Sequence, residues 1–178
     1  MRTVRIHVTG ASGAGTTTLG RALAAELSCP HFDSDDYFWM PTDPPYTTMR
    51  GPEERNGMLL TDLTGMDSWV ESGSLNSWSE ELNALIETVF FLWIPTEIRL
   101  ARLRKREMRK LGRGDEEFME WAAGYDRTGN RETRSRVLHE EWLAGLSCPV
   151  LRLTEDLTTE ERVARTLAWL NSRPGDEP

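Results

Sequence analysis

Apolar residues along the chain recur with two different periods, which predict strands and helices in alternation. Residues Val4 to Val8 alternate apolar with polar side chains, whereas Thr17 to Leu27 repeats its apolar residues at three- and four-residue spacing. The first pattern is typical of a strand and the second of a helix that packs on one side. Val89 to Ile94 is a continuous apolar run, VFFLWI, as expected for a parallel strand buried on both faces.

Segments of the same two kinds fill most of the remaining chain. Further strands are predicted at residues 30–32, 68–74 and 148–153, and further helices at residues 52–63, 97–111, 115–124, 132–145 and 159–170. A proline-broken loop follows the second strand, and the tail 171–178 is expected to be disordered. Strands that alternate with helices predict a doubly wound α/β fold with a parallel sheet, in one domain that covers residues 1–178.

Composition limits the classes of function. The chain has 178 residues, enough for one hydrophobic core, and its formal charge of -8 disfavours a general nucleic-acid or membrane-surface binder. No apolar run reaches the length of a signal peptide or a membrane-spanning helix, so we expect a cytoplasmic protein without membrane contact. Cys29 and Cys148 each occur in Leu-Ser-Cys-Pro between a predicted helix and a predicted strand, and both are expected to be free, buried thiols.

A glycine-rich loop connects the first strand to the first helix. Gly10 and Gly15 have the spacing of the pattern G-x-x-x-x-G-K-[ST], whose backbone N–H groups surround phosphate at the positive end of a helix. Thr17 supplies the hydroxyl that this pattern uses for Mg²⁺, but Thr16 stands where the pattern has lysine. A glycine turn that serves packing alone is the alternative. The residues predicted to bind the nucleotide are Gly10, Ala11, Ser12, Gly13, Ala14, Gly15, Thr16, Thr17 and Thr18.

The missing lysine calls for another source of positive charge, because a cation about 4 Å from a phosphate oxygen contributes roughly 4 kcal/mol at an effective dielectric constant of 20. Two groups of arginines are candidates, the first of them a stripe about 80° wide on a helix surface. The stripe consists of Arg99, Arg102, Arg106, Arg109 and Arg113, and the second group of Arg127, Arg131 and Arg134. A solvated helix face is the alternative, but like charges on one stripe favour a polyphosphate partner.

Carboxylates follow the second predicted strand, at the edge where α/β sheets bind their ligands. Asp33 and Asp35 are two residues apart, so in an extended segment both side chains would face the same way. One can order Mg²⁺ while the other accepts the proton of an attacking hydroxyl. Capping of the following turn by Ser-Asp-Asp is the alternative. Aromatic residues could stack on a planar acceptor, although core packing is the simpler interpretation of each one singly; they are Tyr37, Phe38, Trp39 and Trp78.

These residues resemble the small-molecule and nucleoside or nucleotide kinase branch of the P-loop proteins, particularly the bacterial adenylate-kinase-like ATPases. The resemblance covers most of the chain and is carried by GASGAGTTTLGRALA, FDSDDYFWMPTDPPY, FFLWIPTEIRLARLRKRE, FMEWAAGYD and RSRVLHEEWLAGLSCPVLRL. It implies a three-layer fold with five parallel strands in the order 2-3-1-4-5 and a helical lid at about residues 99–136. It also implies a loop for the nucleotide base at Thr154 to Asp156.

The resemblance also assigns roles. FDSDD is similar to the Asp-x-Asp of shikimate-type kinases and to the Asp-Asp-[Tyr/Phe]-Phe of riboside kinases. Both similarities make Asp35 the catalytic base, and the first makes Asp33 a metal ligand beside Thr17. The catalytic arginines of the lid would be Arg102, Arg106 and Arg109, with Arg113 as a further candidate. The chain departs from the family pattern at Thr16, in place of the loop lysine, and at Ser72, in place of an aspartate at the end of the third strand.

Together the residues and the resemblance predict a kinase that uses ATP and Mg²⁺ to phosphorylate a hydroxyl of a small molecule, with a nucleoside as one candidate. A nucleoside monophosphate kinase, with Arg50 and Arg55 at the acceptor phosphate, is one alternative. A non-catalytic ATP-binding regulatory module is the other, and Thr16 favours it. The acceptor is expected to contact Asp35, Asp36, Tyr37, Trp39, Arg55, Trp78 and Arg127. The protein is expected to be a monomer or a homodimer.

Overall fold

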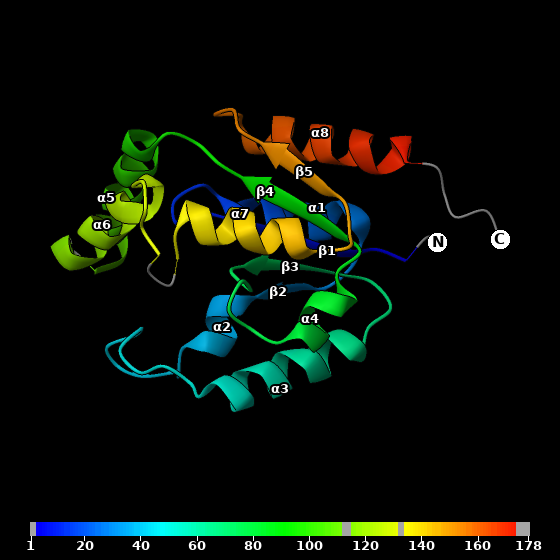
Figure 1. The fold of residues 1–178 in the computed structure, drawn as a ribbon, viewed down its shortest axis with the longest axis horizontal. Coiled ribbons are helices and arrows are strands. Elements are labelled where there is room, and N and C mark those ends of the chain that lie inside the picture. Colours follow the sequence, from blue (N-terminus) through cyan, green and yellow to red (C-terminus); the bar gives the residue numbers. More distant parts are fainter. Residues whose placement is uncertain (1–2, 112–114, 132–133, 174–178) are drawn as a thin grey trace.

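A parallel sheet forms the centre of the molecule. The computed structural model describes residues 3–111, 115–131 and 134–173. In this part of the chain five strands pair in the order β2-β3-β1-β4-β5, all parallel (Figure 1). They are β1 (Arg5–Gly10), β2 (His31–Asp33), β3 (Trp69–Gly73), β4 (Thr88–Leu92) and β5 (Val150–Leu153). The predicted doubly wound fold and its strand order are therefore confirmed.

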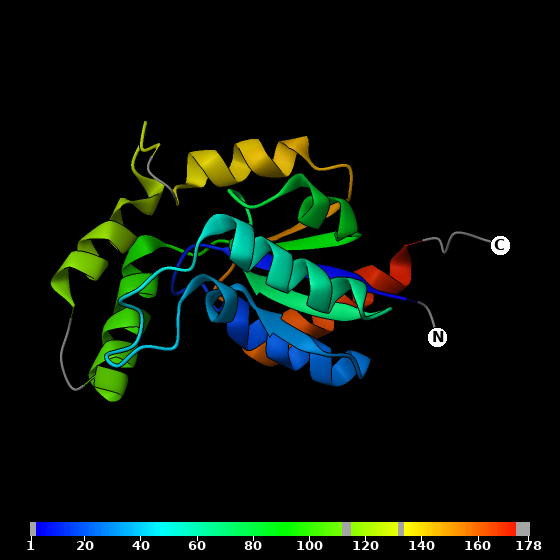
Figure 2. The ribbon, with the colours of Figure 1, turned by 90° about the horizontal axis from the view of Figure 1, so that it is seen from below.

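Helices connect the strands and cover both faces of the sheet (Figure 2). The longer ones are α1 (Thr16–Leu27), α3 (Pro52–Thr64), α5 (Thr96–Leu111), α6 (Glu116–Ala123), α7 (Arg136–Gly145) and α8 (Thr159–Ser172). The shorter ones are α2 (Ser34–Phe38), α4 (Glu80–Leu85) and the 3₁₀ turn η1 (Gly124–Asp126). No helix of the described residues is both long and apolar enough to span a membrane.

Two apolar clusters on opposite faces of the sheet produce the three layers. Ile6 and Val8 of β1 pack with helices α1 and α8 on one face. Phe91 of β4 packs on the other face, with Leu59 of α3 and Leu143 of α7. Strand β4 is buried along its whole length, as its continuous apolar run predicted. The sheet is thereby held rigidly between helices, and its carboxyl edge becomes a fixed platform for a site.

Several boundaries differ from the predictions. A short helix, α2, precedes the predicted proline-broken loop, which occupies residues 39–51, because the side chain of Asp33 accepts a hydrogen bond from the backbone N–H of Asp35 and caps this helix. Helix α4 was not predicted. Helix α7 begins at Arg136, later than expected, and residues 132–133 of the predicted helix lie outside the described residues.

The two chain segments that precede the edge strands also differ from expectation in detail. Cys29 lies just before β2 and Cys148 just before β5, so the cysteines are near opposite edges of the sheet. Both thiols are free, but they are half-buried rather than buried.

The C-terminal tail also differs from the prediction. Helix α8 continues to Ser172, which contradicts the expected disorder from residue 171. Residues 174–178 of that tail lie outside the described part of the chain.

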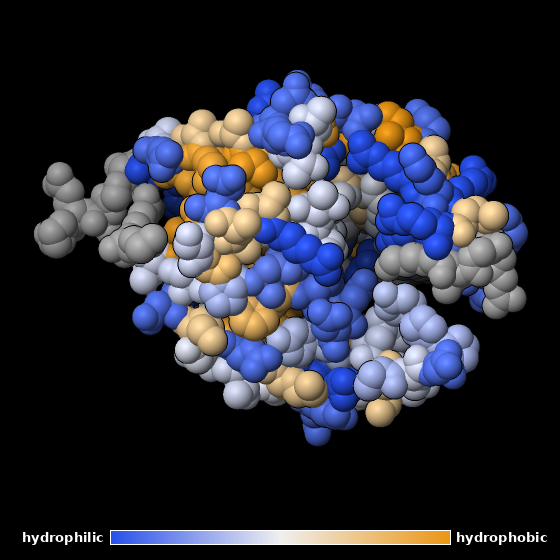
Figure 3. Space-filling model, turned by 180° about the vertical axis from the view of Figure 1, so that it is seen from behind, coloured by the Kyte–Doolittle hydropathy of each residue, from blue (hydrophilic) through white to orange (hydrophobic). Residues whose placement is uncertain are grey.

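Helices α5 and α6 form a separate lobe at the carboxyl edge of the sheet (Figure 1). The lobe has a small apolar cluster of its own, made by Leu103 of α5 with Met119 and Ala122 of α6. Figure 3 shows a hollow between this lobe and the loop that connects α2 to α3, walled largely by hydrophilic residues. A helical lobe therefore stands beside the carboxyl edge, where the resemblance placed a lid.

Candidate active site

The loop between β1 and α1 has the backbone geometry of an anion site. Gly13 and Gly15 have φ values of +84° and +100°, which side chains rarely adopt. A Cβ atom on Gly10 would lie 2.2 Å from the carbonyl oxygen of Leu92, so this position requires glycine. No side chain caps the start of α1, and its first turn carries no acidic residue. The first N–H groups of α1 therefore remain available for an anion, which the helix dipole also attracts.

The loop connects to the acidic end of β2 through one hydrogen bond. The hydroxyl of Thr17 donates to Asp33 Oδ2 at 3.0 Å, and Asp33 is only 9% exposed. The other carboxylate oxygen of Asp33 caps α2. Asp35 therefore lies in a helical turn and not, as predicted, in an extended segment with Asp33. It is exposed whereas Asp33 is buried, so the two carboxylates occupy different environments although they are only two residues apart.

Short side chains bring the ends of β2 and β3 together beside this acidic end. The hydroxyl of Ser34 donates to the carbonyl oxygen of Ser72 at 3.3 Å and accepts from the backbone N–H of Ser74 at 3.1 Å. A Cβ atom on Gly73 would lie 1.7 Å from the Ser34 hydroxyl. The hydroxyl of Ser72 lies 2.9 Å from His31 Nε2, within hydrogen-bond distance. These contacts fix the direction in which α2 leaves the sheet.

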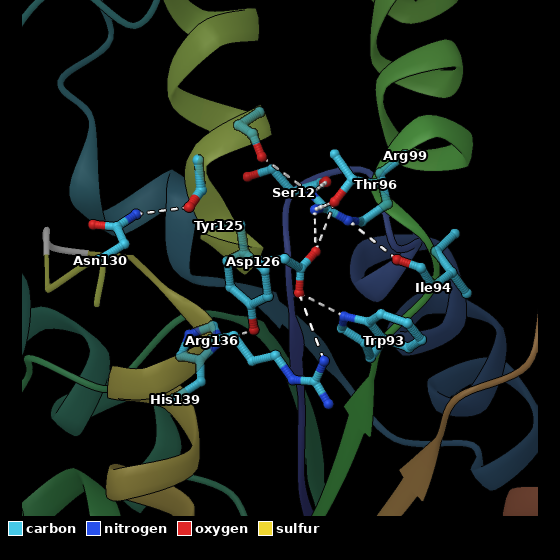
Figure 4. Close-up of polar contacts among 12 residues, drawn as sticks. Ser12, Trp93, Ile94, Thr96, Arg99, Tyr125, Asp126, Asn130, Arg136 and His139 are labelled. Carbon is cyan, nitrogen blue, oxygen red and sulfur yellow. Dashed lines mark hydrogen bonds and ion pairs between the residues drawn. The ribbon is translucent and has the colours of Figure 1, made fainter. Parts of the chain in front are cut away.

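The structure removes Arg99 from the predicted cationic stripe. Arg99 is fully buried at the start of α5, and its Nη2 lies 2.9 Å from Asp126 Oδ2 (Figure 4). Its Nη1 donates to the carbonyl oxygen of Ser12 at 3.2 Å, inside the glycine-rich loop. Arg99 therefore joins the glycine-rich loop to α5 and η1 and is not on the exposed face that the 3,4 spacing predicted.

Asp126 accepts several hydrogen bonds at the point where α5 meets the glycine-rich loop. It accepts hydrogen bonds from Trp93 Nε1 and Thr96 Oγ1, both at 2.7 Å, in addition to the bond from Arg99 (Figure 4). Burial by itself would raise the pKa of Asp126, but these hydrogen bonds outweigh it and the pKa is lowered. Asp126 therefore remains ionised and compensates the buried guanidinium.

The other arginines of the stripe lie closer to the surface. Arg102 donates to Asp156 at 2.6 Å, which connects α5 to the loop after β5. Arg106 contacts Glu107 at 3.2 Å and lies over the ring of Phe118. Arg109 is exposed on α5. The predicted Arg113 lies outside the described residues. These three arginines are therefore carried by α5 without being buried.

The second arginine group separates into different places. Arg134 Nη1 lies 3.5 Å from the hydroxyl of Ser12, so this arginine approaches the glycine-rich loop. Arg131 instead binds Glu141 through two hydrogen bonds on the surface. Arg127, predicted to bind the acceptor, is exposed and lines an open groove between η1 and α7. Among these three arginines, only Arg134 contacts the loop.

The predicted acceptor residues fall into two sets. Arg55 of α3 is buried, and its guanidinium lies 4.8 Å from the ring centres of both Phe38 and Trp78. Its Nε has no hydrogen-bond partner, and burial lowers its pKa. Tyr37 is also buried, as the core-packing alternative expected, and its hydroxyl donates to Asp62 at 2.6 Å, which connects α2 to α3.

Two more of these residues remain at the surface. Trp39 is half-buried, with its ring against those of Phe38 and Tyr46. Asp36 is exposed on α2, next to Asp35. The residues that share one side of the carboxyl edge are thus the acidic turn of α2 and the Arg55–Trp78 pair.

Sequence reasoning missed a buried series of hydrogen bonds that connects the end of β3 to η1. His139 of α7 bonds the Ser74 hydroxyl through Nε2 at 3.1 Å and the Tyr125 hydroxyl through Nδ1 at 2.8 Å. Burial, with smaller contributions from Arg134 and His7, lowers the pKa of His139 to about 3. The imidazole is therefore neutral at physiological pH. These residues are too far apart in the sequence for any spacing pattern to connect them.

A second buried pair lies deeper in the sheet. His7 of β1 and Glu71 of β3 contact each other through Nδ1 and Oε2, and both side chains are completely buried. Burial raises the pKa of Glu71, while His7 opposes this effect. The ring of Trp142 on α7 packs against His7 at 5.5 Å. Glu71 is therefore part of the core and not of the site at the carboxyl edge.

Comparison of the sequence with known proteins identifies two relatives. No model of a known protein family matches the chain. The uncharacterized protein YqaC of Bacillus subtilis (strain 168) is 44% identical over 177 residues, which cover 94% of this chain and 97% of YqaC. The chain belongs to the same family as YqaC. Shikimate kinase 2 of Syntrophotalea carbinolica is 34% identical over a shorter stretch of 110 residues, 57% of this chain and 64% of that enzyme.

Solved structures extend the comparison to the fold. The crystal structure of shikimate kinase from Bacteroides thetaiotaomicron is similar with a TM-score of 0.59 and 21% identity, covering 94% of this chain and 98% of that one. The strand order 2-3-1-4-5 with helices on both faces matches this enzyme. The chain therefore has the fold of the P-loop kinases.

Proposed function

We propose that the protein is a phosphotransferase that uses ATP and Mg²⁺ to phosphorylate a hydroxyl group of a small molecule. The observation that carries this proposal is the hydrogen bond between Thr17 and Asp33. It joins the first turn after a phosphate-binding loop to a carboxylate at the neighbouring strand end. A loop that served packing alone would have no need of this pairing. The similarity to shikimate kinases, over part of one sequence and in the fold, supports the same class of reaction.

The oxygen atoms at this point suit Mg²⁺. The Thr17 hydroxyl and the Asp33 carboxylate are hard oxygen donors, and a nearby phosphate would add more. When bound, the metal would neutralise charge on the phosphate groups. The loop N–H groups would hold those phosphates in place, and Thr17 and Asp33 would hold the metal. Because Asp33 also caps α2, the metal site and the catalytic turn would be positioned by one side chain.

Asp35 is suited to act as the general base of this reaction. It would accept the proton of the acceptor hydroxyl as that oxygen bonds the γ-phosphorus, while the bond between the γ-phosphorus and its bridging oxygen breaks and ADP leaves. Arg102, Arg106 and Arg109 of the lid would neutralise the charge on the transferred group. None of the three is buried, so each would be able to approach the transferred group when the lobe closes, Arg102 in exchange for its bond to Asp156.

The acceptor would lie beside α2, against Arg55, Trp78 and Trp39. Arg55 is buried, and its Nε has no hydrogen-bond partner. This favours a substrate that offers Arg55 a hydrogen-bond acceptor or a negative charge. This leaves a nucleoside monophosphate as the alternative substrate. Arg50 gives that alternative less support, since it binds Glu54 and the carbonyl oxygen of Tyr37. A non-catalytic ATP-binding module remains the rival proposal from another class.

The proposed function is tested with Asp35→Asn. We expect this variant to bind Mg-ATP as the wild type does, because the proposal assigns the phosphates to the loop and the metal to Thr17 and Asp33. Turnover should fall by about a hundredfold or more, the usual contribution of a general base. Binding is measured by calorimetry, and turnover by ADP release with a panel of polyols, nucleosides and monophosphates.

Glu53→Gln is the matched control, because Glu53 is an exposed carboxylate in the first turn of α3. It should leave both quantities unchanged. Equal turnover of Asp35→Asn and the wild type would show that Asp35 is not the base. Mg-ATP binding without turnover on any acceptor would support the non-catalytic module, and an absence of Mg-ATP binding would contradict the whole proposal.

A further inference from the structure

Helix α8 places an arginine against the back of the glycine-rich loop. Arg162 lies near the start of α8 and is only 4% exposed. Its Nη1 donates to the carbonyl oxygen of Ala14 at 2.7 Å. A Cβ atom on Gly15 would come within 2.9 Å of the same nitrogen. The guanidinium therefore touches the loop immediately before Thr16, the position that lacks lysine.

Among the residues that the structure describes, no carboxylate forms an ion pair with Arg162, and Asp156 favours its charge only from a distance. The two acidic residues in the loop before α8 have other partners, since Asp156 binds Arg102 and Glu155 binds Arg165. Nε and Nη2 of Arg162 are buried without a hydrogen-bond partner. A buried cation without a direct ion pair costs free energy, and here burial outweighs the favourable interaction with Asp156, so that the pKa of Arg162 is lowered. An anion bound on the other side of the loop would offset part of this cost.

The other arginines near the loop are less suited to this purpose. Arg134 is only half-buried, and its Nη1 reaches the Ser12 hydroxyl at 3.5 Å. Arg99 is neutralised by Asp126. Arg102 is about two-fifths exposed and paired with Asp156, so water and its partner both weaken its field at the loop. Arg162 combines contact with the loop, nearly complete burial and the absence of an ion pair among the described residues. Burial makes a charge act over a longer distance, because little water screens it.

We propose that Arg162 supplies, from behind the loop, the positive charge that Thr16 does not provide to the phosphates of the bound nucleotide. This inference rests on the proposed function, and it adds the residue that compensates the missing lysine. Arg162 would act through the loop backbone, so it is a positioning residue and not a catalytic one. Thr16 and Arg162 then form a compensating pair, in which a lysine at position 16 contributes most when Arg162 is absent.

The test measures Mg-ATP and Mg-ADP binding by calorimetry for the wild type, Arg162→Gln, Thr16→Lys and the double variant. Glutamine at position 162 offers an N–H donor for the Ala14 carbonyl but no charge. We expect Arg162→Gln to weaken Mg-ATP binding about tenfold, or about 1.4 kcal/mol, and Mg-ADP binding by less. Thr16→Lys should strengthen binding more in the Arg162→Gln background than in the wild type. Arg165→Gln, on the exposed side of α8, should change neither affinity.

The outcomes separate this inference from the proposed function. Binding by the wild type with unchanged affinity in Arg162→Gln would overturn the role of Arg162 and leave the proposed function in place. An equal gain from Thr16→Lys in both backgrounds would show a merely structural role. Failure of the wild type to bind, with or without rescue by Thr16→Lys, would overturn both. If Arg162→Gln does not fold, Arg162→Lys takes its place in the test. Lysine keeps the positive charge, so this variant should retain the wild-type preference for Mg-ATP over Mg-ADP. Loss of that preference would refute the inference.

Discussion

Removal of the Asp126 carboxylate should destabilise the fold far more than removal of an exposed one. Asp126→Ala would leave the fully buried guanidinium of Arg99 without its counter-charge and two further donors, Trp93 and Thr96, without their acceptor. Breaking a buried ion pair on one side costs about 3–5 kcal/mol. The side chain of Asp126 is 22% exposed, so water can replace part of the lost interaction. We therefore expect the lower end of this range, about 3 kcal/mol.

Urea unfolding followed by circular dichroism measures this change. With a slope of about 2 kcal/mol per molar urea, the midpoint should fall by about 1.5 M. Glu155→Ala is the matched control, because Glu155 pairs with Arg165 where both side chains are about half exposed, and it should cost less than about 1 kcal/mol. A loss below about 1 kcal/mol for Asp126→Ala, with an unchanged slope, would refute the view that Asp126 compensates Arg99.

The pH dependence provides a second check on the same residue. The pKa of Asp126 is lower in the folded chain than in the unfolded chain. Its contribution to the free energy of unfolding is therefore fully present above the ordinary aspartate pKa of about 3.9 and is lost as the pH falls through the lower folded value. The difference between wild type and Asp126→Ala should shrink in that acidic window. A constant difference down to the lowest pH at which the protein folds would contradict this assignment.

Two other variants test the loop and the buried histidine. Gly10→Ala should lower the free energy of unfolding by about 2 kcal/mol or more, because its Cβ atom would meet the Leu92 carbonyl oxygen. Gly57→Ala, where a Cβ atom meets no other atom, should be neutral or stabilising in the same urea experiment. Equal effects of the two variants would contradict the close packing at Gly10. The pKa of His139 is about 3 in the folded chain, so the unfolded chain binds more protons between about pH 3 and 6.5. The free energy of unfolding should therefore fall as the pH decreases through this range. His139→Gln should make the free energy of unfolding depend less on pH. An unchanged pH dependence would show that another group dominates the acid response.

Local patterns were sufficient for the elements that face the sheet. The alternation before Gly10 and the spacing after Thr17 gave β1 and α1, since burial of one side imposes a period on the sequence. The run VFFLWI gave β4 for a related reason, because a central parallel strand is buried on both sides. Helix α2 was missed, although its cap was recognised as a possibility, because a five-residue helix shows no full period.

The sequence by itself determined the sheet, the glycine-rich loop and the acidic strand end, because each depends on neighbouring residues or on a short repeat. Only the tertiary structure decided which arginines are exposed. Arg99 belongs to the same spacing as Arg102, but it lies where Asp126, 27 residues further along the chain, closes over it. Arg162 meets Ala14 across 148 residues. Spacing along a helix defines a face, whereas the charge and burial of that face depend on segments that only the folded chain brings together.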